Sequence, residues 1–261
     1  MRFLLTLVFA LALPVSAETI EVDVELALMV DVSRSMDPIE LELQRRGYAE
    51  AIKSDQVVGV ILNSYTGSIA LTYVEWAGNG LQRVIVPWTK IDSREDAEAV
   101  AEKLTAQFEY SMRRTSISGA MYYALEDFDN NDFVGLRQVI DISGDGPNND
   151  GRPVLQARER ALAAGLVING LPIMVDGGAS PWSIPNLDVY YERCVIGGPG
   201  AFSIPVYAWE DFPLAVRRKL VLELAQATVL PEIGGGLSAE PYDCFIGEKK
   251  RQEWELRYGE P

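Results

Sequence analysis

The segment LALMVDVSRSMD, residues 26–37, decides the fold class of this chain. Its first half is continuously apolar, and the residues before it alternate between apolar and polar from Ile20 onward. A strand that becomes apolar on both faces is typical of the centre of a sheet covered by helices on both sides. The apolar run stops at Asp31, and small oxygen-bearing side chains follow it. The segment therefore predicts a buried strand that ends in a cluster of ligand oxygens.

Further strands and helices alternate along the chain. Pro38 favours the start of a helix over 38–53, and two strands around the turn AGNG, at 68–76 and 83–88, predict a hairpin. Additional helices are expected over 93–108, 117–128, 153–165, 187–195 and 210–227 (with Leu214, Val221 and Leu224 inward), and additional strands over 137–143, 167–175 and 201–207. This alternation predicts an α/β, Rossmann-like fold with a mainly parallel central sheet, one antiparallel edge strand and helices on both faces.

The first seventeen residues have the features of a secretory signal peptide. They contain one positive charge, an apolar run from Phe3 to Leu13 and a small-residue ending at Ala17. The run is too short to span a bilayer comfortably, and no cysteine follows Ala17 to carry a lipid anchor. We expect cleavage after residue 17, a periplasmic or secreted location and no membrane span. Residues 18–227 would then form the main domain and 228–261 a C-terminal extension.

Composition excludes several classes of function. The formal net charge of −15 disfavours binding to nucleic acids and anionic membranes, and solubility is the simpler use of this charge. The chain contains no histidine, which excludes Ser-His-Asp and Cys-His catalysis and the usual zinc sites that contain histidine. Oxygen-rich sites remain easy to build, and these suit Mg²⁺, Mn²⁺ or Ca²⁺.

The two cysteines, Cys194 and Cys244, are expected to form one disulfide in an oxidising compartment. The bond would close a loop of about fifty residues and contribute about 3–4 kcal/mol in the chain-entropy model. It would also tie the C-terminal extension back to the main domain.

Three segments bring oxygens to the carboxyl edge of the predicted sheet, where ligands bind in open α/β folds. Asp31, Ser33 and Ser35 follow the first strand at alternate positions, which point the same way in extended backbone. Thr115 precedes a helix in RRTSISGAM, and Asp145 follows a strand in DISGDG. Two carboxylates and three hydroxyls form a donor set for a hard cation such as Mg²⁺.

With these residues the chain resembles a von Willebrand factor A (vWA) domain that has a metal-ion-dependent adhesion site (MIDAS). The resemblance covers about residues 22–227 and implies that both serines and Thr115 contact the metal directly, with the aspartates acting largely through water. It also implies a protein or peptide partner that offers a carboxylate to the metal. The whole chain further resembles a bacterial group of exported proteins of unknown function with a late CVIGGPGAF segment, here Cys194–Phe202.

Two departures from the family pattern leave alternatives open. SGDG is one residue longer than the usual TDG turn, so Asp141 competes with Asp145, although its place inside an apolar strand favours a hydrogen-bonded structural role. Arg113 and Arg114 stand where the family often has glycines, and they either meet an acidic partner or remain solvated beside nearby acids. Asp37 is expected to be the N-cap of the helix that starts at Pro38.

Simpler interpretations accompany each prediction. The pattern D-x-S-x-S alone also suits an N-cap and turn, and PNNDGRP, residues 147–153, favours a turn over a Ca²⁺ site.

We expect a non-enzymatic module that binds a divalent cation. The alternatives are a Mg²⁺-dependent, phosphatase-like hydrolase and a structural vWA domain with a vestigial metal site.

Overall fold

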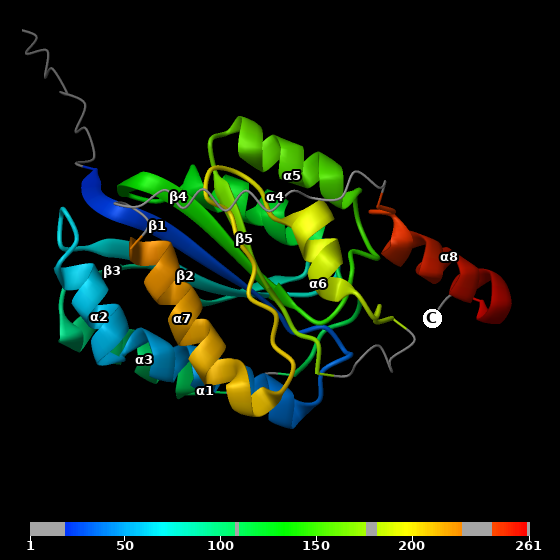
Figure 1. Cartoon of the computed structure of the whole chain (residues 1–261), viewed down its shortest axis with the longest axis horizontal. Coiled ribbons are helices and arrows are strands. Elements are labelled where there is room, and N and C mark those ends of the chain that lie inside the picture. Colours follow the sequence, from blue (N-terminus) through cyan, green and yellow to red (C-terminus); the bar gives the residue numbers. More distant parts are fainter. Residues whose placement is uncertain (1–18, 108–109, 176–181, 226–241, 260–261) are drawn as a thin grey trace, which may run out of the picture.

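The computed structural model describes residues 19–107, 110–175, 182–225 and 242–259, and it contains a five-stranded sheet (Figure 1). The strands are β1 (Ile20–Asp31), β2 (Ile69–Trp76), β3 (Gln82–Ile91), β4 (Phe133–Gly144) and β5 (Val167–Pro172), in the spatial order β3-β2-β1-β4-β5. All neighbouring pairs are parallel except β2 and β3, which are antiparallel. The predicted mainly parallel sheet with one antiparallel edge strand is confirmed.

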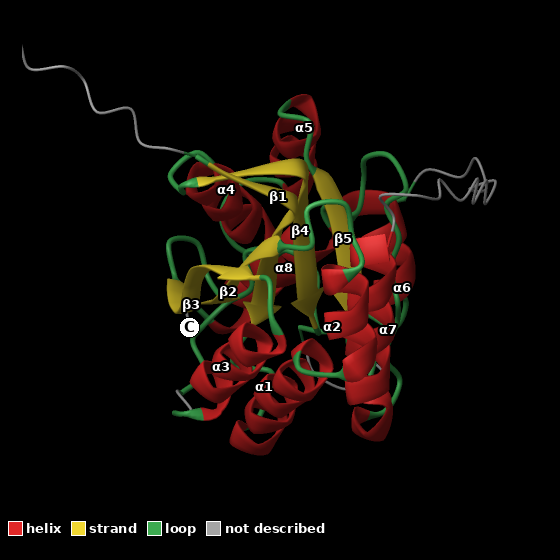
Figure 2. Cartoon of the chain, turned by 90° about the vertical axis from the view of Figure 1, so that its left-hand side faces the viewer, coloured by secondary structure: helices red, strands yellow, loops and turns green. Residues whose placement is uncertain are grey.

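Helices cover both faces of this sheet (Figure 2). One face carries α1 (Pro38–Ile52), α2 (Asp55–Leu62), α3 (Arg94–Thr105) and α7 (Phe212–Ala225); the other carries α4 (Ile117–Phe128), α5 (Val154–Ala163), α6 (Leu187–Tyr190) and the π-helix η1 (Tyr191–Val195). A short 3-10 helix, η2 (Trp209–Asp211), precedes α7, and α8 (Ile246–Tyr258) ends the described chain.

Strand β1 separates two apolar cores. Leu26, Leu28 and Val30 belong to the core beneath α1 and α7, whereas Ala27 and Met29 belong to the core beneath α4 and α5. Because side chains alternate along a strand, burial of both faces requires a continuously apolar sequence. The run at residues 26–30 is the sequence signature of this central position.

The strand predicted over 201–207 is wrong. This segment runs beside β5 but forms only isolated bridges, from Ser203 to Gly170 and from Val206 to Ile173. Pro172 and Pro205 lack the N–H group that a continuous ladder requires. The mixture of apolar residues and proline therefore gives an extended segment with intermittent hydrogen bonds.

Helix α7 also differs from its predicted orientation. Leu224 is buried as expected, but Leu214 is 57% exposed, while Lys219 and Glu223 are completely buried. The buried face of α7 therefore includes an ion pair, which a search for an apolar stripe does not detect.

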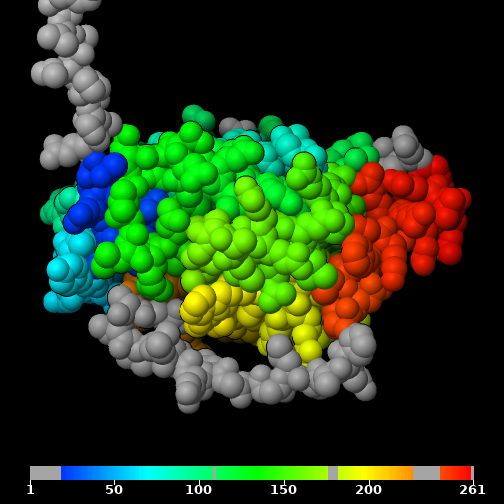
Figure 3. All heavy atoms as spheres, turned by 90° about the horizontal axis from the view of Figure 1, so that it is seen from above, coloured from blue at the N-terminus to red at the C-terminus, as the bar shows by residue number. Residues whose placement is uncertain are grey.

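The C-terminal extension contains helix α8, which the sequence analysis did not predict. A disulfide joins Cys194, in η1, to Cys244, just before α8, so the predicted pairing is present. Figure 1 shows α8 at the end of the molecule where β1 and β4 finish, and Figure 3 shows the C-terminal segment protruding at that end. None of the helices in the described part of the chain is long and apolar enough to cross a membrane. The predicted signal peptide, 1–17, lies outside the described residues.

Candidate metal-binding site

Strands β1 and β4 place two carboxylates at the same edge of the sheet. Val30 pairs with Ser143 in the parallel ladder, so Asp31 and Asp145 follow neighbouring strand ends. Asp31 Oδ1 accepts the backbone N–H of Ser33 at 2.7 Å. The Ser33 and Ser35 Oγ atoms are 3.0 Å apart, and Ser35 Oγ donates to Asp145 Oδ1 at 2.8 Å. Four of the five predicted ligands therefore form one connected cluster.

The fifth predicted ligand, Thr115, lies directly before α4 and is only 5% exposed. Its N–H donates to Asn149 Oδ1 at 3.0 Å, and its carbonyl accepts the N–H groups of Asn149 and Asp150 at 2.9 and 3.1 Å. The preceding loop is tied to the first segment because Met112 N–H donates to the Val32 carbonyl at 2.8 Å. Ser33, Ser35 and Thr115 line the same surface groove.

Asp31 is completely buried, and its Oδ2 atom has no hydrogen-bond partner among the described residues. Burial raises the pKa of Asp31 well above its usual value, and the charge of Asp145 raises it further, whereas the hydrogen bonds from Ser33 lower it. A Cβ on Gly144 would lie 2.9 Å from Asp31 Oδ2, so the absence of a side chain at residue 144 leaves room for this carboxylate.

The cluster has the chemistry of a site for a hard cation. Its side chains offer only carboxylate and hydroxyl oxygens, which Mg²⁺, Mn²⁺ and Ca²⁺ accept. Among the described residues, no three side chains of the His, Cys, Asp and Glu types gather closely enough to hold a metal. A cation at this place therefore depends on the serine and threonine hydroxyls, and the unpaired Asp31 Oδ2 is consistent with such a ligand.

Asp141, the competing acid, lies elsewhere. Its Oδ1 is 2.7 Å from Lys219 Nζ in a fully buried cluster that also contains Glu223. Burial raises the pKa of Glu223 to about 7, the charge of Asp141 adds to this rise, and Lys219 opposes it. The structural role predicted for Asp141 is confirmed, and Asp145 is the carboxylate beside Ser35.

The flanking residues have separate roles. Asp37 is the N-cap of α1, as predicted, because its Oδ1 accepts the N–H groups of Ile39 and Glu40. The Glu40 carboxylate accepts the N–H of Asp37 in return, which completes a capping box. Arg114 has φ +70° and pairs with Asp150 at 3.3 Å. Arg113 is exposed, and its carbonyl accepts the N–H of Gly78 at 3.0 Å.

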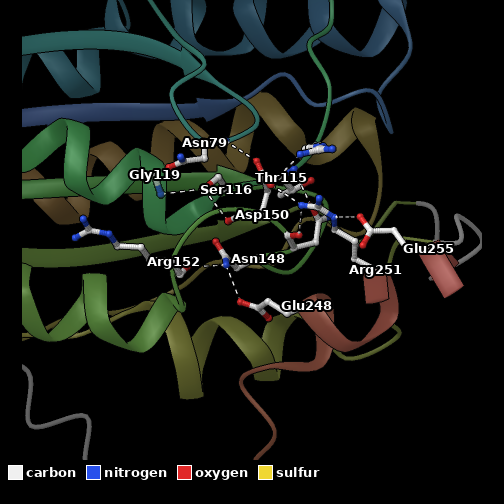
Figure 4. Close-up of polar contacts among 12 residues, drawn as sticks. Asn79, Thr115, Ser116, Gly119, Asn148, Asp150, Arg152, Glu248, Arg251 and Glu255 are labelled. Carbon is white, nitrogen blue, oxygen red and sulfur yellow. Dashed lines mark hydrogen bonds and ion pairs between the residues drawn. The ribbon is translucent and has the colours of Figure 1, made fainter. Parts of the chain in front are cut away.

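The segment 147–153 forms a loop that lies between the segment of Thr115 and helix α8 (Figure 4). Asn148 Oδ1 accepts the Ser118 N–H at 2.9 Å, and Asn148 Nδ2 donates to Glu248 of α8 at 2.8 Å. Asp150 accepts the Asn79 N–H at 2.8 Å and pairs with Arg251 of α8. The loop thus connects α4 to α8 and to the turn between β2 and β3.

Sequence reasoning missed the contribution of the C-terminal extension. Arg251 and Trp254 of α8 line the same groove as Ser33, Ser35 and Thr115, together with Trp182. The available signal was the run from Glu248 to Tyr258, which contains good helix formers and neither glycine nor proline.

Comparison with solved structures gives the class of this protein. Three similar structures are proximal thread matrix protein 1 from the mussel byssus with a zinc-occupied MIDAS motif (TM-score 0.56, 16% identity, 80% of this chain and 49% of that one), the pilus adhesin SpaC from Lactobacillus rhamnosus GG (0.59, 12%, 79% and 31%) and the conserved hypothetical protein BatB from Bacteroides thetaiotaomicron (0.50, 16%, 78% and 99%). At these identities they show the fold alone, which is that of a vWA domain. The chain spans about half the length of the mussel protein.

A family assignment follows from the sequence itself. Residues 21–228 match the model of a family described as a protein of unknown function (DUF1194), and the chain belongs to this family. A search of curated proteins found no match.

Proposed function

We propose that this protein is an exported, non-enzymatic vWA module that holds a divalent cation and, through it, binds an acidic group of a protein partner. The cation would be held by Asp31, Ser33, Ser35, Thr115 and Asp145. In the family pattern the three hydroxyls contact the metal directly and the two aspartates act largely through water.

One observation carries this proposal. The Asp31 carboxylate is buried, its Oδ2 has no partner among the described residues, and Asp145 adds a second negative charge to the same cluster. A buried carboxylate oxygen without a hydrogen bond is costly. A divalent cation between the two acids would compensate both charges and would use the neighbouring hydroxyls as further ligands.

The partner class follows from the charge of the ligand set. Neutral hydroxyls in the direct shell leave a cation electron-poor, so it gains from one more anionic oxygen. Ser33, Ser35 and Thr115 line an open groove, which gives a partner's carboxylate access to the cation. The zinc-occupied MIDAS motif of the mussel protein and the adhesin SpaC, both with this fold, support a metal-dependent binding role.

Mg²⁺ is the cation that we propose first, with Mn²⁺ and Ca²⁺ as alternatives. All the proposed ligands are oxygens, and Mg²⁺ commonly retains waters while it uses few protein ligands. Among the described residues no thiolate is available to the cluster, because the two cysteines form the disulfide.

A paramagnetic experiment tests the proposed function. The protein is loaded with Mn²⁺ and mixed with the peptide Gly-Gly-Asp-Gly-Gly or its asparagine counterpart, both with blocked ends. If the carboxylate binds the metal, the aspartate methylene NMR signals broaden far more than the asparagine signals. Ser33→Ala should abolish the difference. Equal broadening by both peptides, or broadening that persists in the variant, would count against the proposal.

We also propose that the site does not catalyse hydrolysis. In the part of the chain that the structure describes, the ionisable side chains that line the groove, besides the proposed ligands, are four arginines and Asp150. Arginine stays protonated and provides no general base, and Asp150 is paired with Arg114 and Arg251. Mg²⁺-dependent turnover of p-nitrophenyl phosphate that is lost in Asp145→Ala would instead favour the hydrolase.

The proposed location, periplasmic or secreted without a lipid anchor, rests on the segment 1–17 and is supported by the disulfide, since such bonds persist in oxidising compartments. Intact-mass measurement of the protein from its native host tests this proposal. The mass should correspond to a chain that begins at Glu18, and retention of residues 1–17 would contradict it.

A further inference from the structure

Helix α8 forms one wall of the groove that contains the proposed metal site. The groove has a volume of about 800 Å³, and its lining includes Ser33, Ser35 and Thr115 as well as Arg251 and Trp254 of α8. The helix lies beyond the residues that match the family model, which end at 228. The metal-binding pattern of the vWA fold therefore gives no role to α8 in this groove.

Several contacts fix α8 in this position. The Cys194–Cys244 disulfide anchors its start, Asn148 donates to Glu248 at 2.8 Å, and Lys250 donates to the Ser183 carbonyl at 2.8 Å. Figure 4 shows Glu248 and Arg251 pointing toward the loop 147–153, which is hydrogen-bonded to Thr115. Arg251 also donates to the Asn149 carbonyl at 3.2 Å. The same loop thus positions a proposed metal ligand and α8.

The groove is positively charged in a chain that is strongly acidic overall. Among the described residues, its lining contains Arg34, Arg113, Arg114 and Arg251 but only one acid, Asp150. Asp150 pairs with Arg114 and Arg251. Arg34 and Arg113 are exposed and have no ion-pair partner among the residues that the structure describes. This local excess of positive charge favours an acidic partner.

The wall at α8 adds aromatic surface. The rings of Trp182 and Trp254 are 5.5 Å apart, and the rings of Trp254 and Tyr258 are also 5.5 Å apart. Both tryptophans line the groove and are partly exposed. Tryptophan, tyrosine and arginine are the residues that most often dominate the energetics of protein interfaces. The aromatic surface and the two unpaired arginines therefore suit a peptide with acidic and large apolar side chains.

We infer that α8, Arg34 and Arg113 form a second binding surface beside the metal, specific for an acidic peptide segment that carries an aromatic residue. One carboxylate of this segment binds the metal, a second pairs with Arg34 or Arg113, and the aromatic side chain packs on Trp182 and Trp254. This inference rests on the proposed function, because the first carboxylate requires the cation.

Fluorescence anisotropy with labelled peptides tests the inference on Mn²⁺-loaded full-length mature protein. The probes are Gly-Glu-Asp-Gly-Trp-Gly and three relatives: one with serine for the tryptophan, one with glutamine for the glutamate, and one with asparagine for the aspartate. We expect the parent peptide to bind at least tenfold more tightly than any relative. The double variant Arg34→Gln/Arg113→Gln should remove the preference for glutamate, and Trp254→Ser the preference for tryptophan.

Matched variants outside the groove provide controls. Arg160→Gln removes an exposed arginine from α5, and Leu256→Ser changes a side chain of α8 that is 82% exposed. Both should bind all four peptides as the unmodified protein does. Mn²⁺ affinity is measured for every variant first, so that loss of peptide binding is separated from loss of metal.

The possible outcomes distinguish a failure of the second binding surface from a failure of the proposed function. Metal-dependent binding with no preference among the aspartate-containing peptides, or preferences that survive Arg34→Gln/Arg113→Gln and Trp254→Ser, would overturn the second surface and leave the proposed function standing. Binding that is indifferent to both Mn²⁺ and the aspartate would overturn the proposed function as well. Stronger binding of a polyuronate competitor, lost in the same variants, would overturn the peptide in favour of an acidic polysaccharide.

Discussion

At the scale of single residues, the alternation of Asp31, Ser33 and Ser35 was sufficient to predict their clustering, because the spacing of side chains in extended backbone is a local property. The choice between Asp141 and Asp145 could not be made from the sequence. It depends on Lys219, which is distant in sequence and forms a buried ion pair with Asp141 inside the core. The position of Thr115 was predicted, but its support by Asn149 requires a contact across 34 residues.

Arg114 illustrates another limit of sequence reasoning. The family often has glycines before the threonine, and residue 114 has φ +70°, a conformation that glycine adopts without strain. Arg114 adopts this left-handed conformation without being glycine, and its side chain pairs with Asp150. Neither feature could be predicted from two adjacent arginines.

The first prediction concerns Gly144. Its substitution by alanine would place Cβ 2.9 Å from Asp31 Oδ2 and 3.0 Å from the Tyr191 hydroxyl. We expect Gly144→Ala to lower the free energy of unfolding by about 1–3 kcal/mol, measured by urea denaturation. Gly59→Ala is the matched control, since nothing lies within 4 Å of a Cβ there and α2 should gain about 0.5–1 kcal/mol. Equal effects of the two substitutions would contradict the crowding at residue 144.

The second prediction concerns the buried acid Glu223. Its pKa in the folded protein is about 7, above the ordinary value of 4.5. The folded state therefore binds a proton that the unfolded state releases between about pH 4.5 and 7, and this contribution to stability is lost as pH rises through that window. Relative to Glu223→Gln, the unmodified protein should lose at least about 1 kcal/mol of stability between pH 5 and pH 8.

Denaturant titrations of both proteins across this pH range measure the difference. The exposed Glu98→Gln, on α3, serves as the control and should follow the unmodified protein. A constant difference between the unmodified protein and Glu223→Gln at all pH values would show that Glu223 does not titrate in this window.

At the scale of elements, periodicity predicted most of the strands and helices that have one apolar face or two, although it missed the short helix α2. It failed where other forces hold an element in place. Helix α8 is polar on most of its surface, and it is held mainly by the disulfide that precedes it, by one ion pair and hydrogen bonds to the rest of the fold, and by one tryptophan pair. The segment 201–207 has the apolar composition of a strand, but Pro205 interrupts its ladder.

The third prediction tests the start of α1. Asp37→Ala removes the side-chain acceptor for the N–H groups of Ile39 and Glu40 and should lower the free energy of unfolding by about 1 kcal/mol. Asp37→Asn keeps an acceptor and should be nearly neutral. Thermal or urea denaturation measures both. An equal loss in the two variants would mean that charge, rather than the cap hydrogen bonds, is the important property.

At the scale of the whole molecule, the order of elements was sufficient to predict a sheet between two helical layers, because buried parallel strands require helices on both faces. How the C-terminal extension lies on that fold could not be predicted. Its position results from a loop of 50 residues closed by the disulfide, and from one ion pair and several hydrogen bonds between residues about a hundred positions apart. The groove beside the proposed metal site is formed jointly by α8 and the main domain, so no single element predicts it.

The fourth prediction concerns the disulfide. Replacing Cys194 and Cys244 by serine removes the cross-link and should lower the free energy of unfolding by about 3–4 kcal/mol, since the unfolded chain regains the freedom of a fifty-residue loop. Urea denaturation of the variant and of the oxidised protein measures this change. A loss confined to faster proteolysis of α8, with an unchanged global transition, would show that the bond stabilises only the extension.

The most direct test of the account is a calorimetric titration of Mn²⁺ into chelator-treated mature protein and into Asp31→Asn. Asparagine keeps the shape of Asp31 but removes its charge, and the exposed Asp92→Asn provides the matched control. We predict saturable binding at one site, unchanged in Asp92→Asn and weakened at least tenfold in Asp31→Asn. Binding that is equally strong in Asp31→Asn, or no saturable binding by the unmodified protein, would contradict a metal site at the end of β1.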